Sequence, residues 1–240
     1  MKIIRPAWQV TGDLAGGAIF SDDGRYRYLL RRRLGDAPLE AAWVLLNPST
    51  AGADADDPTV RRLAAFSRRE GAGSMAVVNL FALCSADPAA LLADPSPAGP
   101  LNDAAIAAAV NGRTPRIIIC GWGAFPDRAA LRGRIGQVRA LLAASPWPVR
   151  CLGLTAGGQP VHPLYQPAWA PLAGFDLTPP PPRPRTRTLA EREQLAVATR
   201  TCPRCHTPRP DACRAIRPGQ QPMNRPHPQR TALIPAEEPA

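Results

Sequence analysis

Apolar residues in this chain fall into short runs that are separated by segments with helical spacing. Mostly apolar runs at residues 43–46, 75–80, 117–120 and 149–152 have the length of buried strands. Continuous apolar strands that alternate with helices are typical of a parallel sheet covered on both faces. The pattern therefore predicts an α/β fold, namely a parallel-sheet three-layer sandwich.

Turn and capping residues predict where several elements begin and end. Residues 18–20 and 26–30 flank residues 21–24 (Ser-Asp-Asp-Gly), which is typical of a β-hairpin turn. Asp57 followed by a proline predicts the start of a helix that ends near Gly71. Further helices are expected at residues 88–93, at 103–110 with Asn102 as the N-cap, and from Asp127 to about Ala143.

The composition changes near the end of the predicted sheet. Residues 179–185 are prolines and arginines, which can form neither helix nor sheet, so they predict a polyproline II linker. Beyond them, Thr188 and Glu191 match a capping box at the start of a short helix. The expected parts are an α/β domain over residues 1–175, a linker over 176–187, and a tail over 188–240 with a disordered end.

The charge of the chain predicts an anionic partner. The net charge is +10, and all but one of its 29 cationic side chains are arginine. Codon usage can explain arginine in place of lysine, but it does not explain the excess of positive charge. Because the planar guanidinium suits phosphates and stacks on bases, we expect DNA or a nucleotide as the partner.

Several classes of protein are disfavoured. No apolar run approaches the roughly 18–20 residues of a membrane span, and the N-terminus does not resemble a secretory signal, so we expect a cytoplasmic protein without a membrane partner. Six cysteines are too few for a disulfide scaffold of this length, and no disulfide-linked partner is expected. Cys84, Cys120 and Cys151 lie singly among apolar residues, as small buried side chains do.

Polar and aromatic residues follow each predicted strand and so fall at the edge of the sheet where such folds bind ligands. They are Asn47, Ser49 and Thr50 after the first strand, Asn79 at the end of the second, Trp122 after the third, and His162 and Tyr165 after the fourth. Asp57, Arg61 and Arg62 lie at the start of the first predicted helix, where backbone N–H groups favour anions. We expect these residues to form one substrate site.

Two of these residues are candidates for catalysis. The Asn47 amide can hold a water or a ligand, and the His162 imidazole can act as acid, base or electrophile near neutral pH. Structural interpretations stay open: Asn47 can make an Asx turn, Asp57 can only cap its helix, and a lone histidine is often structural. Because His162 is the only histidine before the linker and no nucleophile elbow is present, metal-dependent hydrolysis and serine-type acyl transfer are disfavoured.

Several motifs carry a resemblance to a known family. They are LLNPSTA at residues 45–51, DPTVRR at 57–62, VNLFA at 78–82, GWG at 121–123, CLGLT at 151–155 and HPLY at 162–165. In order and spacing they resemble the bacterial and phage family called domain of unknown function 1643, over about residues 15–175. That family name implies no activity.

A more distant similarity suggests an activity. An Asn-Pro loop after the first core strand, an asparagine on the second and a late His-Pro loop are similar in order to the uracil-DNA glycosylase superfamily. The resemblance implies a uracil-DNA-glycosylase-like fold. It also implies that Asn47 orients the attacking water, Asn79 reads a base edge and His162 supports the departing base.

Three cysteines near the C-terminus indicate a structural zinc site. Cys202 and Cys205 form a C-x2-C pattern, and Cys213 follows after seven residues. His227 is the expected fourth ligand, because it is distant enough for the chain to fold back to the cysteines. His206 is the alternative, but it directly follows Cys205 and would be strained as a second ligand beside it. The pattern resembles a small DNA-binding zinc domain of phage and actinobacterial proteins. The arginines expected to contact phosphates are Arg204, Arg209, Arg214, Arg217 and Arg225.

Two hypotheses about function follow. In the first, the chain is an enzyme that processes a base, nucleotide or nucleic acid, with N-glycosidic bond chemistry as one form, and its zinc tail holds DNA. In the second, it is a non-catalytic DNA- or nucleotide-binding accessory protein of phage or mobile-element origin. Substitution of Asn47 or His162 separates the two, because the second hypothesis has no turnover to lose.

Overall fold

The computed structural model describes residues 8–13, 16–49, 55–112, 114, 116–125, 131–178, 188–200, 202–204, 206, 226 and 228–232. The chain divides into two compact units, residues 1–179 and residues 180–240. The first is a mixed α/β unit. The second contains helices α5 (Leu189–Thr199) and α6 (Pro228–Thr231) in its described part.

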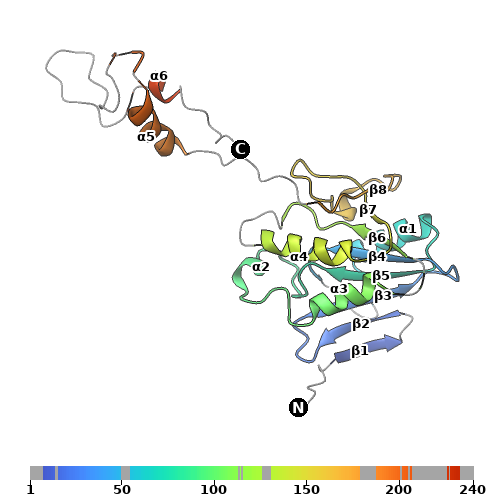
Figure 1. The fold of residues 1–240 in the computed structure, drawn as a ribbon. Coiled ribbons are helices and arrows are strands. Elements are labelled where there is room, and N and C mark those ends of the chain that lie inside the picture. Colours follow the sequence, from blue (N-terminus) through green and yellow to red (C-terminus); the bar gives the residue numbers. More distant parts are fainter. Residues whose placement is uncertain are drawn as a thin grey trace. The chain divides into compact units, whose positions relative to one another are not determined.

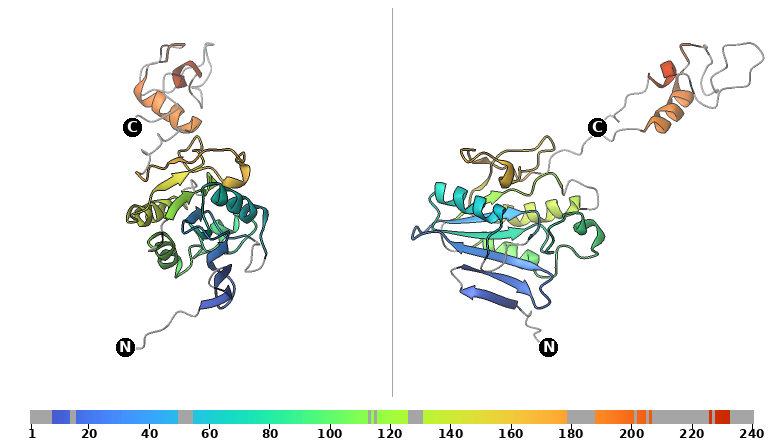
Figure 2. Two further views of the ribbon diagram at one scale, coloured as in Figure 1. Left: turned by 90° about the vertical axis from the view of Figure 1, so that its right-hand side faces the viewer. Right: turned by 180° about the vertical axis from the view of Figure 1, so that it is seen from behind.

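A mixed sheet whose central strands are parallel lies in the middle of the first unit (Figure 1). Its described strands are β1 (Trp8–Asp13), β2 (Gly16–Ser21), β3 (Arg27–Arg33), β4 (Glu40–Leu45), β5 (Ser74–Asn79), β6 (Arg116–Cys120), β7 (Val149–Cys151) and β8 (Ala173–Gly174), in the order β1-β2-β3-β5-β4-β6-β7-β8. The central strands β5, β4, β6 and β7 run parallel, as predicted. The strands from β1 to β3 extend the sheet antiparallel beside β5, and β8 pairs antiparallel with β7 (Figure 2).

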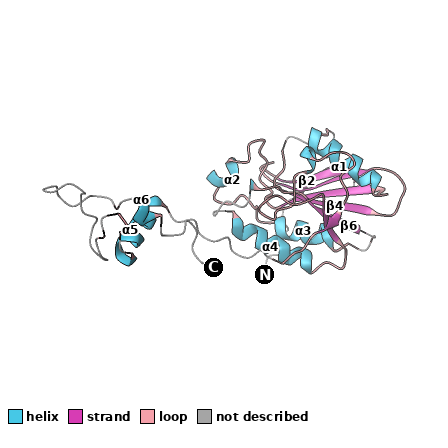
Figure 3. Cartoon of the chain, turned by 90° about the horizontal axis from the view of Figure 1, so that it is seen from above, coloured by secondary structure: helices cyan, strands magenta, loops and turns pink. Residues whose placement is uncertain are grey.

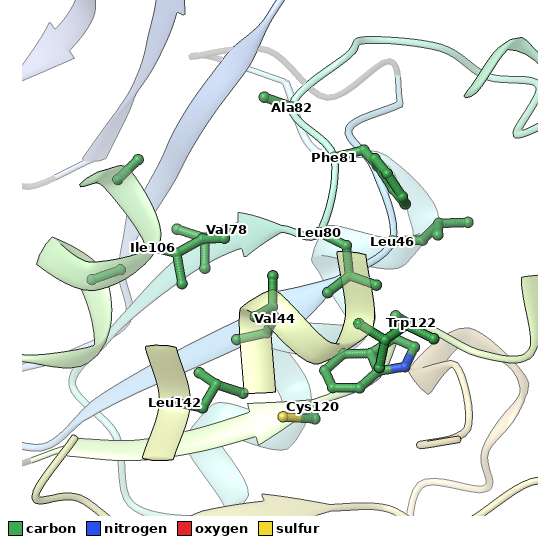
Figure 4. Close-up of a cluster of buried hydrophobic side chains, with 14 of the residues drawn as sticks. Val44, Leu46, Val78, Leu80, Phe81, Ala82, Ile106, Cys120, Trp122 and Leu142 are labelled. Atoms are coloured by element: carbon green, nitrogen blue, oxygen red, sulfur yellow. The ribbon is translucent and has the colours of Figure 1, made fainter. Parts of the chain in front are cut away.

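Helices cover both faces of the sheet, so the layered arrangement predicted from the apolar runs is confirmed. Helix α1 (Pro58–Arg69) covers one face, and α3 (Asn102–Val110) and α4 (Arg132–Ala143) cover the other (Figure 3). Strand β4 is buried along its whole length and alternates between the two layers. Trp43 and Leu45 pack toward α1, whereas Ala42 and Val44 pack in the cluster under α3 and α4 (Figure 4).

Local signals placed the start and end of α1 correctly. Asp57 is its N-cap, and one carboxylate oxygen accepts a hydrogen bond from the N–H of Val60 at 2.8 Å. The helix ends at Arg69, and Gly71 follows with a φ of 79°, a conformation that favours glycine. The predicted hairpin is likewise present as β2 and β3.

Other predicted boundaries differ from the structure. Asn102 is the first residue of α3 and not its N-cap, because its buried side chain donates hydrogen bonds to the carbonyl oxygens of Asn79 and Leu80 at 2.9 and 3.0 Å. Helix α4 begins at Arg132, and the cap predicted at Asp127 lies outside the described residues. Helix α2 is a single turn, Ala90–Ala93. Strands β1 and β8 were not predicted.

The described part of the second unit begins with the predicted helix and its N-cap. Thr188 and Glu191 form a capping box at the start of α5, with each side chain bonded to the backbone N–H of the other residue. Cys202 follows the helix and is buried. No helix in the described part of the chain is both long and apolar enough to cross a bilayer.

Candidate functional site

A cavity of about 320 Å³ lies beyond the carboxyl ends of β4 and β5, beside the first turn of α1. Its lining residues are Arg27, Leu45, Leu46, Asn47, Ser49, Asp57, Thr59, Val60, Val77, Asn79, Ser85, Ala86, Pro88, Trp122, Gly123, Ala124, Phe125, His162 and Tyr165. The connection after β4 leads to β5 on one side, and the chain then crosses to β6 on the other side of β4. This is the switch point at which open α/β sheets bind ligands.

The cavity brings together seven of the residues predicted for the site. These are Asn47, Ser49, Asp57, Asn79, Trp122, His162 and Tyr165. Thr50 lies outside the described residues. The two arginines predicted from α1 do not line the cavity. The guanidinium of Arg61 donates to the carbonyl oxygen of Asp56, and that of Arg62 donates to the carbonyl oxygen of Gln166.

Main-chain hydrogen bonds hold the loops around the cavity. After β5, the N–H groups of Leu80 and Phe81 donate to the carbonyl oxygens of Leu45 and Leu46 at 2.8 and 3.0 Å. After β6, Gly123 donates through its N–H to Pro160, in the loop that carries His162, at 2.8 Å. The loops that follow different strands are therefore tied to one another by backbone atoms.

Asn79 presents a buried amide to the cavity. Its side chain lies on the α1 face of β5, and the residue is 1% exposed. Neither its Oδ1 nor its Nδ2 hydrogen-bonds to any described residue. Leaving a buried polar group unsatisfied costs about 1–3 kcal/mol, so this amide is suited to a ligand that offers both a donor and an acceptor.

The backbone beneath Asn79 is fixed from the other face of the sheet. Besides the Asn102 amide, the buried guanidinium of Arg134 donates through Nε to the carbonyl oxygen of Leu80 at 2.6 Å. The same arginine is paired with Asp103. These contacts orient the end of β5, and with it the direction of the Asn79 side chain.

Asn47 uses one end of its amide to shape the loop. Its Nδ2 donates to the carbonyl oxygens of Pro48 and Ser85 at 2.9 and 2.8 Å. Its Oδ1 receives no hydrogen bond from the described residues, so this oxygen can accept one from a water or a ligand in the cavity. These contacts are not the Asx turn predicted as the structural alternative, in which Oδ1 would be the acceptor, and they leave Oδ1 open to a functional role.

His162 is held in one tautomer by its own loop. Its Nδ1 accepts a hydrogen bond from the N–H of Leu164 at 3.3 Å, so in the neutral ring the proton is on Nε2. Burial lowers the pKa of His162, an effect that Asp57 opposes through its charge. The imidazole is therefore neutral near pH 7 and can donate a hydrogen bond from Nε2.

Arg27 was not predicted as a site residue, although it lines the cavity. It is buried, and this burial lowers its pKa to about 10, so it stays a cation at neutral pH. Its place between Tyr26 and Tyr28 in a strand is typical of a solvent-facing side chain, so the sequence offered no signal for it. In a strand that is covered on both faces, however, such a position is buried as well.

A family model matches much of the first unit. Residues 27–164 match the family model described as "Protein of unknown function (DUF1643)". The chain belongs to the DUF1643 family. Comparison of this DUF1643 chain with curated proteins and with solved structures finds no match.

Most of the residues predicted for the metal and nucleic-acid sites of this DUF1643 protein lie outside the described residues. These are Cys205, Cys213, His227, Arg209, Arg214, Arg217 and Arg225. Of the others, Cys202 is buried and Arg204 is exposed in the turn that follows it. The described residues contain no cluster of metal-ligating side chains.

Proposed function

We propose that this DUF1643 protein binds a nucleobase or nucleotide in the cavity and acts on its glycosidic bond. The observation that carries the proposal is the buried, unpartnered amide of Asn79 at the cavity wall. An amide that offers a donor and an acceptor side by side matches the donor–acceptor edge of a base. The cavity is at the small end of the range of ligand pockets, which suits one base with part of its sugar.

The other groups around the cavity suit hydrolysis of an N-glycosidic bond. Asn47 Oδ1 would orient a water, whose oxygen attacks the anomeric carbon as the bond to the base breaks. The bonding electrons leave with the base, and a hydrogen bond from Nε2 of neutral His162 stabilises the charge that develops there. The attacking water releases one proton to solvent and the departed base takes one up, so the products are a sugar hydroxyl and a neutral base. The positions of these residues in the sequence are similar to those of the uracil-DNA glycosylase superfamily, which supports the same assignment.

Base binding and base release are measured separately. Asn79→Ala should weaken the binding of free bases and nucleosides about 10-fold or more in equilibrium dialysis, since the wild-type amide gains its missing partners only from the ligand. Asn111→Ala, at the exposed end of α3, is the matched control. Unchanged binding of every base by Asn79→Ala would contradict the proposal.

Release of base from DNA and from nucleosides is followed by mass spectrometry. Asn47→Ala should abolish release and leave most of the binding, because the residue positions the water. His162→Ala should lower the rate less completely. If wild-type protein binds bases but releases none from modified or unmodified substrates, the non-catalytic accessory role of phage or mobile-element origin becomes the better function.

We further propose that the tail is a structural zinc module that binds DNA. In support, the N–H of His206 donates to the carbonyl oxygen of Cys202 at 2.8 Å, and His206 has a φ of 51°. This tight turn is compatible with a C-x2-C pair that holds one metal ion. The ligands would be Cys202, Cys205, Cys213 and His227, with His206 as the alternative to His227. Reduced cysteines of this kind suit the cytoplasm.

Zinc content tests the tail directly. Elemental analysis of the purified protein should find about one zinc per chain, and the Cys202→Ser, Cys205→Ser double variant should lose it. Cys84→Ser, which changes a cysteine in the first unit, should keep the metal. Full zinc content in the double variant would rule out this site.

A further inference from the structure

We infer that helix α1 and the segment over residues 163–170 form a surface that binds a single strand of nucleic acid beside the cavity. The aromatic–arginine surface consists of Tyr165, Trp169, Arg61, Arg62, Arg68 and Arg69. This inference rests on the proposed function, because a bound strand would deliver one of its nucleotides to the cavity. It adds that the substrate is a polymer and not a free nucleotide.

Two aromatic side chains of the segment face solvent. Tyr165 is 80% exposed and Trp169 is 79% exposed, whereas Trp43 and Trp122 are buried in the core. Exposed aromatic rings four residues apart contribute little to the stability of the fold. Such rings are the groups on which bases of single-stranded nucleic acids stack, and this stacking is independent of sequence.

The arginines of α1 reach the backbone on which these rings are mounted. The 3-10 helix η2 (Pro163–Tyr165) packs against α1. Arg62 donates to the carbonyl oxygen of Gln166, next to Tyr165, and Arg69 donates to that of Ala168, next to Trp169, at 2.8 Å. Both guanidinium groups also lie over the ring of Phe66, with Cζ at 5.2 and 4.9 Å from its centroid.

Charge on this surface favours a polyanion. Helix α1 contains four arginines and no acidic residue. Arg61 and Arg68 are exposed and lie two turns apart on the solvent-facing side of the helix. Arg69 is paired with Glu70, so part of its charge is balanced. Cations beside exposed aromatic rings are the combination with which proteins bind single strands of nucleic acid.

Tyr165 connects this surface with the cavity. It lines the cavity and is also largely exposed, and its ring centroid lies 5.6 Å from that of His162. A strand stacked on Trp169 and Tyr165 would therefore place the next nucleotide at the cavity entrance. An acidic peptide would use the arginines but would gain nothing from this order of rings.

Binding of an oligothymidylate of about 12 nucleotides to the full chain tests the inference, because this probe has no secondary structure and fits the site size of such surfaces. Fluorescence anisotropy should show that Trp169→Ala weakens binding on the order of 5- to 100-fold, and that Trp169→Phe restores most of it. Leu92→Ala removes another exposed apolar side chain, on α2, and should change nothing. Equal affinity of Trp169→Ala and wild-type protein would overturn the inference.

Quenching of tryptophan fluorescence locates the strand. The oligothymidylate should quench part of the emission of the wild-type protein, and Trp169→Phe should lose most of this quenching although it still binds, because a nucleotide in the cavity can quench only Trp122. Any binding by the second unit adds to the anisotropy of every variant but does not mimic the loss of quenching. Quenching that is undiminished in Trp169→Phe would show that the strand lies elsewhere.

Salt dependence tests the role of the arginines. The Arg61→Gln, Arg68→Gln double variant should bind more weakly, with a salt slope that is smaller by about 0.7 for each phosphate that the variant no longer neutralises. Arg33→Gln is the matched control, since Arg33 is exposed at the opposite end of the sheet. An equal loss of binding in Arg33→Gln would indicate general charge attraction and overturn the inference.

Two further probes distinguish a single strand from other anionic partners, and one variant distinguishes this inference from the proposed function of the cavity. A DNA duplex of the same length and a polyglutamate peptide should bind more weakly than the single strand, and Trp169→Ala should not affect them. Loss of polyglutamate binding in Trp169→Ala would indicate a protein partner instead. Asn79→Ala should lose base binding but keep the quenching, so a failure of the cavity and a failure of the surface give different results.

Discussion

Replacing Gly121 with alanine should destabilise the first unit and move the loop that carries His162. Gly121 follows β6, and a Cβ added there would lie 2.8 Å from Cδ and 2.9 Å from Cγ of Pro163, and 3.2 Å from Cδ2 of Leu45. A proline ring in a buried position cannot rotate away from such a contact. The strain must therefore displace the backbone next to His162 or remain in the native state.

The expected cost is that of an overpacked core, about 1–3 kcal/mol of unfolding free energy. Gly136→Ala is the matched control, because Gly136 lies in an exposed part of α4 and an added Cβ meets nothing within 4 Å. There alanine should stabilise the protein by about 0.5–1 kcal/mol, since glycine is a poor helix former. Replacing glycine with alanine should therefore lower the unfolding free energy at Gly121 and raise it at Gly136.

Urea unfolding followed by tryptophan fluorescence measures both variants, since Trp43 and Trp122 are buried in this unit. The midpoint should fall for Gly121→Ala and rise for Gly136→Ala. Base binding should also weaken in Gly121→Ala alone, because the His162 loop forms one wall of the cavity. If Gly121→Ala were as stable as Gly136→Ala, the close packing of Gly121 on Pro163 would be refuted.

Three other variants test the core and the titration of the site. Glu40→Gln should lower the unfolding free energy by about 3–5 kcal/mol in urea titrations, because it leaves the buried guanidinium of Arg116, 2.8 Å from the carboxylate, without its charge partner. Ser67→Ala should cost about 1–3 kcal/mol by the same measurement, because the buried indole N–H of Trp43 loses its acceptor at 2.9 Å, and no loss would contradict that bond. Burial lowers the pKa of His162 below its ordinary value of 6.5, so its contribution to stability is present above that pH and is lost as the pH falls through the lowered pKa. His162→Gln should flatten this part of the pH profile, and an unchanged profile would exclude the residue as its source.

The apolar pattern was sufficient for the interior of the sheet but not for its edges. Strands β4, β5 and β6 are buried on both faces, so their sequences are nearly continuous apolar runs that stand out from their surroundings. Strand β8 has two exposed residues and is defined only by its pairing with β7. No periodicity can be recognised in a segment of that length.

The candidate site was partly predictable because parallel strands bring their carboxyl ends to one edge. This rule alone brought Asn47, Asn79 and His162 to one cavity. It could not show that the Asn102 side chain would bond to the end of β5 instead of capping its own helix. Nor could it place Arg27 at the cavity, because that depends on how β3 is covered by layers distant in sequence.

The main-chain hydrogen bonds between the loops have a consequence for how this cavity can change. Backbone N–H and C=O groups, such as those that join Gly123 to Pro160, do not depend on which side chains the loops carry. Residues such as Ser49 and Ala124 can therefore be exchanged without loosening the frame that holds them. Libraries of substitutions restricted to these lining positions should yield folded proteins with altered ligand preference. Substitutions at Gly121, which packs against the loop that carries His162, should instead destabilise the fold.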